Sequence, residues 1–191
     1  IVGGDPLVSK RQIQFYRIIA RMYGVALGTI LQSALLPMQK RKIRTLFVPV
    51  LPAPTDTSQH SRQTEYHAYH NEESRRETIL ACIAQFPQKQ VLILVPTIQA
   101  LDSLTVALQS AQTPDVISWH GGLSQKEKFE RWVQIRSGSA RVVIGTRAAL
   151  LLPFFDLGHI VIDIEHSDYH KQADQQPRID VRDSVCIHQK V

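Results

Sequence analysis

The sequence has few of the features that mark secreted, membrane-bound or metal-binding proteins. Its only cysteines, Cys82 and Cys186, have no metal-ligand spacing, and no signal-peptide layout opens the chain. We therefore expect both thiols to be reduced core residues. No apolar run approaches the roughly 20 residues that cross a bilayer. These absences predict a cytoplasmic protein with no membrane partner and no bound metal.

Acidic residues are missing from one long stretch of the chain. Between Lys10 and Arg44 there is no Asp or Glu, whereas eight Lys and Arg residues occur there. A segment of this kind attracts phosphate backbones without reading base sequence. A solvated helix face is the alternative interpretation.

The totals describe an ordinary globular chain. With 191 residues, 43% of them hydrophobic and 20% charged, the chain suffices for one substantial core, or for one domain with an appendage. It begins with Ile1 rather than Met, which leads us to expect a fragment or a processed product.

The amino-terminal part of the chain differs from the rest in the spacing of its apolar residues. Apolar residues recur at helical spacing over 12–23 and 27–36, and Pro37 ends the second stretch. A proline-rich and then polar run follows. We therefore expect a helical segment with a basic tail at 1–45, a linker at 46–70 and a compact lobe at 71–191.

Helices and strands are predicted to alternate in the lobe. Ser124 is followed three residues later by Glu127, the capping-box spacing that opens a helix. Alternation of this kind implies right-handed crossovers and an α/β fold with a parallel sheet. Beyond Ser167 the chain is polar and has no obvious period. The predicted elements are helices at 72–86 and 99–110, a helix from Ser124, and strands at 91–95, 115–119, 141–145 and 159–162.

Two of these strands end in residues that suit phosphate chemistry. Strand 141–145 runs into Thr146 and Arg147, and strand 159–162 delivers Asp163, Glu165 and His166. Ligands of open parallel sheets bind outside the carboxyl ends of the strands. These residues are therefore candidates for contact with a nucleotide, its metal or a nucleic acid.

The order of the segments resembles the primosomal replication-restart DNA helicase family. The resemblance implies the first RecA-like motor lobe of an ATP-driven helicase, which uses ATP and magnesium and binds DNA. It is carried by QIQFYRIIARMYGVALGTILQSALLP at 12–37 and, between 89 and 185, by KQVLILVPTI, HGGLS, RVVIGTRAALLLPF, DLGHIVIDIEH, HKQ and PRIDVRD.

The chain departs from the family at the phosphate-binding loop. The family places a G-x-x-x-x-G-K-T loop before KQVLILVP, whose backbone amides cradle phosphates. Here the region reads YHNEESRRETIL at 69–80, with no glycine and with Glu72, Glu73 and Glu77. These carboxylates bring negative charge toward a polyphosphate.

A second departure lies in the acidic box, which the family writes Asp-Glu-Glu-His. Asp163 and His166 match, but Ile164 replaces the glutamate that activates water. Losing a general base typically costs about 10²-fold to 10⁴-fold in rate. Glu165 is the alternative base, because residues two apart on a strand share a face. We expect no catalytic residue, only a remnant box of Asp163, Glu165 and His166, and no ATP or magnesium cofactor in this chain.

Contacts to DNA are expected to survive better than the nucleotide site. In the family the loop after the GTR strand approaches the DNA backbone, so Thr146 and Arg147 are candidate phosphate contacts. Lys171, Arg178 and Arg182 lie in the matching HKQ and PRIDVRD segments. Surface salt bridges with Asp174, Asp180 and Asp183 are the alternative for these three.

Three hypotheses follow for the function. The first is a divergent or truncated homologue that keeps the lobe as a DNA-binding element of replication restart, bound to forked or single-stranded DNA and to other restart proteins. The second is a fragment of a working ATP-dependent DNA helicase with a rebuilt nucleotide loop. The third is a fragment without activity of its own, because the family's second lobe and zinc-binding cysteines are missing from the sequence.

Overall fold

A four-stranded parallel sheet forms the centre of the computed structural model, which describes residues 8–35, 63–113, 115–171 and 178–190. The strand order is β2-β3-β1-β4, and every neighbouring pair runs parallel. The prediction of an α/β, RecA-like lobe with a parallel sheet is confirmed. The strands are β1 (Gln90–Leu94), β2 (Val116–Trp119), β3 (Val142–Gly145) and β4 (Leu157–Ile162).

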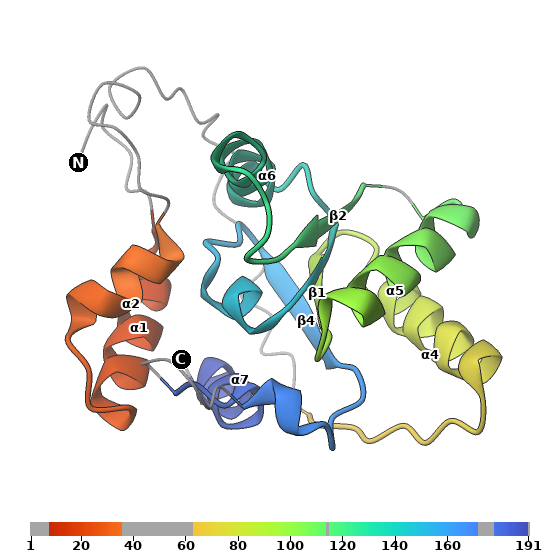
Figure 1. The fold of residues 1–191 in the computed structure, drawn as a ribbon, viewed down its shortest axis with the longest axis horizontal. Coiled ribbons are helices and arrows are strands. Elements are labelled where there is room, and N and C mark those ends of the chain that lie inside the picture. Colours follow the sequence, from red (N-terminus) through yellow and green to blue (C-terminus); the bar gives the residue numbers. More distant parts are fainter. Residues whose placement is uncertain (1–7, 36–62, 114, 172–177, 191) are drawn as a thin grey trace.

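Helices cover both faces of the sheet (Figure 1). Leu92 and Leu94 of β1 pack toward α1, α2, α6 and α7, whereas Val91 and Ile93 pack toward α4 and α5. This alternation follows from the two-residue period of a strand. The α-helices are α1 (Lys10–Met22), α2 (Leu27–Ala34), α4 (Glu72–Gln85), α5 (Ile98–Ser110), α6 (Gln125–Ser137) and α7 (Val181–Lys190).

The predicted elements are present, with ends shifted by at most two residues for most of them. The capping box before α6 is confirmed: the Ser124 hydroxyl accepts from the Glu127 N–H, and the Glu127 carboxylate accepts from the Ser124 N–H. Gly138 ends α6 with φ 78°, a left-handed value that glycine adopts at little cost.

The amino-terminal helices share the core of the lobe. Tyr16 of α1 donates its hydroxyl hydrogen to the carbonyl oxygen of Leu151 at 2.7 Å, and Trp132 of α6 donates to the carbonyl oxygen of Ala34 at 3.2 Å. Both aromatic side chains are buried. The division at 1–45, 46–70 and 71–191 stays a prediction, and 36–62 lie outside the described residues.

The carboxyl-terminal part is more regular than the sequence indicated. The short 3₁₀ helix η2 (Asp168–His170) and helix α7 follow Ser167. Val181 and Val185, one helical turn apart, bury one side of α7 in an otherwise polar stretch. Cys186 lies on its exposed side, so the prediction of a core cysteine is wrong there, whereas Cys82 is buried. Both thiols are free, and burial raises the pKa of Cys82.

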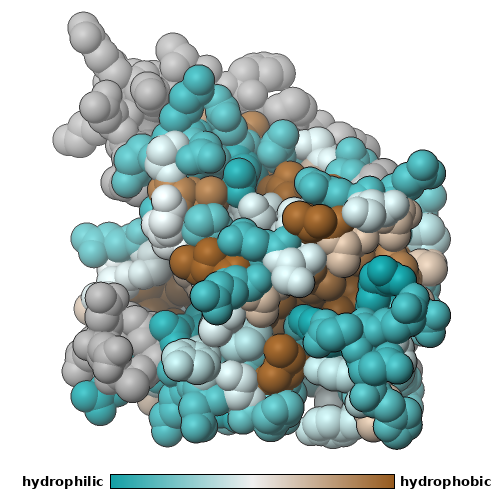
Figure 2. Space-filling view, turned by 45° about the vertical axis from the view of Figure 1, so that its right-hand side comes forward, coloured by the Kyte–Doolittle hydropathy of each residue, from teal (hydrophilic) through white to brown (hydrophobic). Residues whose placement is uncertain are grey.

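Among the described helices, none is both long and apolar enough to span a bilayer. The side of the molecule that carries α4 and α5 shows apolar residues in separate spots between hydrophilic ones (Figure 2). Ile98 and Val106 of α5 are exposed hydrophobic side chains of this kind. Scattered apolar residues are normal for a protein surface.

Candidate functional site

The candidate site lies at the carboxyl edge of the sheet. Strands β3 and β4 both end there, one on each side of β1. Thr146 follows β3 and Asp163 follows β4. The chain after β3 turns into the 3₁₀ helix η1 (Arg147–Leu151). A Cβ atom on Gly145 would lie 2.2 Å from the Cβ of Ala149, so only glycine allows this close turn. The topology therefore brings the two predicted groups of site residues to one edge.

Asp163 is held there by a buried ion pair with Arg75 of α4. Nε of Arg75 donates to Oδ1 at 2.9 Å, and Nη2 donates to Oδ2 at 2.5 Å. The exposed fractions of the two side chains are 9% for Arg75 and 2% for Asp163. The hydrogen bond to Asp163 raises the pKa of Arg75 further above its ordinary value, so the guanidinium is always charged.

The start of α4 is closed by its own side chains. Asn71 accepts from the Ser74 N–H at 2.8 Å, and the Ser74 hydroxyl in turn accepts from the Asn71 N–H. A depression of about 310 Å³ beside this helix end is lined partly by the carboxylates of Glu72 and Glu73. The Ser74 N–H is thereby used within the cap, and both glutamates form ion pairs with arginines that line the same depression, Arg75 and Arg76.

The carboxylate that the family resemblance assigns to magnesium, Asp163, is engaged within the protein. A phosphate-bound magnesium ion needs carboxylate oxygens, and both oxygens of Asp163 already accept hydrogen bonds from Arg75. Tyr69 adds a third contact, its hydroxyl lying 3.5 Å from Oδ1 of Asp163. Burial of Tyr69, followed by the charge of Asp163, raises the pKa of its phenol. The carboxylate of Asp163 is thus bonded to side chains of the protein itself, Arg75 and Tyr69.

The acidic box does not continue the strand. β4 ends at Ile162, and Ile164 has φ 51°, a left-handed value that a β-branched residue rarely adopts. The expectation that Glu165 shares a strand face with Asp163 is therefore wrong. Oε1 of Glu165 instead lies 3.9 Å from Nη1 of Arg182. His166 is exposed.

His170 is hydrogen-bonded to the backbone at the start of this turn. It is fully buried, and its Nε2 lies 2.8 Å from the carbonyl oxygen of Asp163. Because a carbonyl only accepts, Nε2 carries the proton in the neutral ring. Nδ1 is buried without a hydrogen-bond partner among the described residues. Burial lowers the pKa of His170, since protonation at Nδ1 would add both a charge and an unpaired donor.

Acid is expected to weaken the fold through this histidine. The folded pKa of His170 lies below the ordinary value of about 6.5, so below that pH the unfolded chain binds more protons than the folded chain. The free energy of unfolding should fall as the pH drops from about 7 to 5. Chemical denaturation of His170→Gln, which keeps a donor near the Nε2 position, should show a shallower fall. His159, whose pKa is also lowered by burial, accounts for part of the remainder. Identical slopes for both proteins would contradict this role.

The predicted DNA contacts after β3 lie close to the turn that carries His170. Nη1 of Arg147 donates to the carbonyl oxygens of Tyr169 and Lys171, at 2.9 Å and 3.0 Å. Thr146 precedes η1 and is half-buried, and Lys171 is exposed. Arg147 thus fixes the backbone that presents Lys171, and both lie on one local surface.

The other two predicted contacts have different surroundings. Arg182 pairs with Asp180 at 2.8 Å, the salt bridge that was the alternative for this residue. Hydrogen bonds from Arg182 lower the pKa of Asp180. Arg178 is exposed, and Asp174 lies outside the described residues. DNA contact by these residues stays a prediction.

The sequence did not point to Arg75, whose side chain bonds to both carboxylate oxygens of Asp163. The sequence did place a basic residue in the first turn of this helix, in the segment that the family resemblance aligns with the phosphate loop. Asp163 is 88 residues away, and only the fold brings the pair together.

Comparison with known proteins finds similarity to replication restart proteins. The chain is 37% identical over 94 residues to the replication restart protein PriA of Synechocystis sp., covering 49% of the chain and 11% of that protein. It is 38% identical over 104 residues to PriA of Chlamydia pneumoniae, covering 54% and 14%. It is 33% identical over 116 residues to PriA of Helicobacter pylori (strain J99), covering 60% and 18%.

No protein-family model matches the chain. The matches span less than a fifth of each of these three relatives, so they concern one part of a larger protein. That part accords with a parallel-stranded α/β lobe. Over about half of its length the chain is therefore similar to one part of the replication restart protein PriA, as a divergent or partial relative would be.

Proposed function

We propose that this chain is a DNA-binding lobe of replication restart that does not hydrolyse ATP. The observation that supports the loss of hydrolysis best is the buried ion pair of Arg75 with Asp163. It uses the carboxylate that the family resemblance assigns to magnesium. Phosphoryl transfer depends on metal and phosphate positioning, so this pair removes its central requirement.

Two further features support the same conclusion. Ile164 offers no carboxylate to activate water, and Glu165 is turned toward Arg182. The segment at 69–80 also has no glycine and no lysine with which to hold a polyphosphate. Three separate changes at one site favour an inactive lobe over a fragment of a working helicase.

DNA binding is proposed from similarity and from charge. The relatives are replication restart proteins, and the chain carries a net charge of +5. Lys171 and Arg178 are exposed. Guanidinium and ammonium groups at such positions bind phosphate oxygens without reading base sequence. Forked or single-stranded DNA is the proposed ligand, and other replication restart proteins are the proposed partners.

The full chain should bind a fluorescent forked oligonucleotide, with an affinity that falls about tenfold to a hundredfold between roughly 50 and 200 mM salt. Anisotropy titrations measure this. Lys171→Gln/Arg178→Gln should weaken binding. Lys126→Gln/Lys128→Gln, with the same charge change on the acid-containing helix α6, is the control. Undetectable fork binding at low salt would reject the proposed DNA binding.

DNA-stimulated phosphate release should stay at background for the full chain, because magnesium and phosphate positioning are both missing. The Ile164→Glu variant should also stay at background, since Arg75 still occupies Asp163. A release rate that rises with DNA and with chain concentration would show a working nucleotide site and overturn this part of the proposal.

A further inference from the structure

One face of α1 carries a row of exposed cations. Lys10, Arg17 and Arg21 are exposed, as is Gln14 between them. At 3.6 residues per turn, these four positions fall within about 60° of the helix circumference. They form a single stripe, which we call the α1 stripe: Lys10, Gln14, Arg17 and Arg21.

In the described part of the chain, no acidic side chain forms an ion pair with the α1 stripe. The helix itself contains no Asp or Glu. Elsewhere cations at the surface do have partners: the half-buried Arg76 pairs with Glu73, and the exposed Lys126 pairs with Glu130. Unpaired like charges on one helix face repel each other. A bound polyanion would relieve this repulsion.

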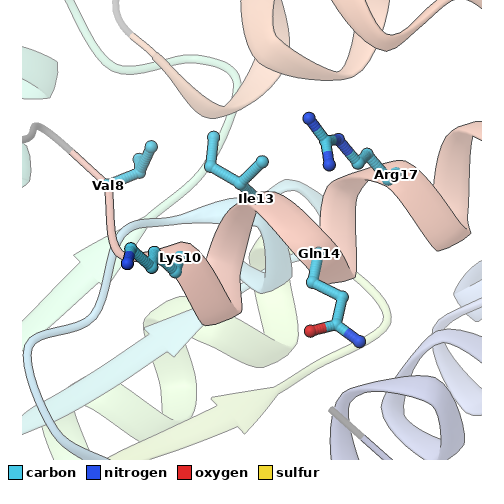
Figure 3. Close-up of a pocket in the computed structure, with 5 residues that line it drawn as sticks. All are labelled: Val8, Lys10, Ile13, Gln14 and Arg17. Carbon is cyan, nitrogen blue, oxygen red and sulfur yellow. The ribbon is translucent and has the colours of Figure 1, made fainter.

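The surface along the stripe is hollowed. A depression of about 420 Å³ is lined by Lys10, Gln14 and Arg17 of the stripe together with Val8 and Ile13. Val8, Ile13 and Arg17 lie along one edge of the helix in Figure 3, and Lys10 and Gln14 lie along the other. The two cations thus stand at opposite ends of the hollow, with an amide and an aliphatic side chain between them.

The dimensions suit a nucleic-acid backbone. From Lys10 to Arg21 the helix rises about 16 Å, at 1.5 Å per residue. One strand of a duplex presents a phosphate roughly every 3.4 Å along the axis, so the stripe is long enough to face several phosphates in succession. Long, flexible Lys and Arg side chains can reach a backbone that runs along the helix.

The helix is fixed to the element that carries another predicted contact. Tyr16 of α1 bonds to Leu151 of η1, and Gln12 donates to the carbonyl oxygen of Phe154 at 2.9 Å. η1 begins at Arg147. A ligand bound on the α1 stripe would therefore be held at a fixed position relative to the loop after β3.

We propose that the α1 stripe is a second phosphate-backbone contact for DNA, in addition to the residues at the carboxyl edge of the sheet. The inference rests on the proposed DNA binding. A membrane surface is the less suitable anionic partner, because interfacial helices insert an apolar face. The apolar side chains of α1, including Phe15 and Ile19, are buried against the core.

The test compares two charge-matched variants of the full chain. Arg17→Gln/Arg21→Gln removes two cations of the stripe, and Lys126→Gln/Lys128→Gln removes two from α6. Gln has nearly the helix propensity of Lys and Arg, and thermal melts should confirm folding. At about 0.1 M salt the stripe variant should bind the fluorescent forked DNA about tenfold more weakly, with a salt slope smaller by about two. The control should bind like the wild type.

Each outcome has a separate meaning. If the wild type binds DNA and both variants bind equally, the stripe proposal fails while the proposed function stands. If the wild type binds no DNA at low salt, both fail. Sedimentation with phosphatidylglycerol and phosphatidylcholine vesicles covers the membrane alternative: loss of vesicle binding in the stripe variant, with unchanged DNA binding, overturns the proposal. The same pattern with polyglutamate would identify an acidic protein surface as the partner.

Discussion

Replacing Arg75 with methionine is expected to lower the free energy of unfolding by about 3 to 5 kcal/mol. The variant keeps most of the side-chain volume but leaves the carboxylate of Asp163 buried, without its two hydrogen bonds from the guanidinium. An uncompensated buried charge costs far more than the ion pair itself contributes. Urea denaturation followed by circular dichroism measures the change.

The next residue on α4 provides a matched control. Arg76 has a partly exposed side chain and an ion pair with Glu73. Exposed pairs of this kind contribute little, so Arg76→Met should change the free energy of unfolding by less than about 1 kcal/mol. Equal effects of the two substitutions would mean that the Arg75–Asp163 pair is not a specific part of the fold.

A double variant separates the pair from its surroundings. Arg75→Met/Asp163→Leu removes both charges, so it should recover much of the stability that Arg75→Met loses. The coupling energy of the cycle should exceed about 2 kcal/mol. Additive effects of the two substitutions would show that the residues act independently.

The sequence predicted the local features of the fold well because their causes are local. The capping box at Ser124 needs only a hydroxyl and a carboxylate three residues apart, and both bonds form. The buried strands are short apolar runs whose order fixes a parallel sheet. Helix α7 was missed because few apolar residues mark its buried side in a polar stretch: Val181 and Val185 are buried, and Ile187 is partly buried.

The state of the candidate site could not be predicted in the same way. The sequence indicated that Ile164 had replaced a carboxylate, but not that the strand ends at Ile162 and that the backbone of Ile164 is left-handed. That turn directs Glu165 toward Arg182. The pairing of Arg75 with Asp163 joins positions 88 residues apart, and such contacts depend on the packing of α4 beside the sheet. The role of a charged residue such as Arg75 therefore cannot be inferred before its partner is known.

The buried tryptophan of α6 tests whether the amino-terminal helices belong to the folding unit of the lobe. Trp132 is fully buried, lies in the same hydrophobic core as Ile30 and Ala34 of α2, and donates to the carbonyl oxygen of Ala34 at 3.2 Å. Trp132→Ala should therefore lower the free energy of unfolding by about 3 to 5 kcal/mol, through lost contacts and the cavity left behind.

Trp132→Phe is the conservative comparison, because it keeps much of the ring packing and loses the hydrogen bond, and it should cost clearly less than Trp132→Ala. Hydrogen exchange locates the effect. If α2 and the lobe unfold as one unit, Trp132→Ala should speed the hydrogen exchange of backbone amides in both α2 and α6. Faster exchange in α6 with unchanged α2 would show that the helical segment is stable without the lobe, which would favour the predicted separate segment at 1–45.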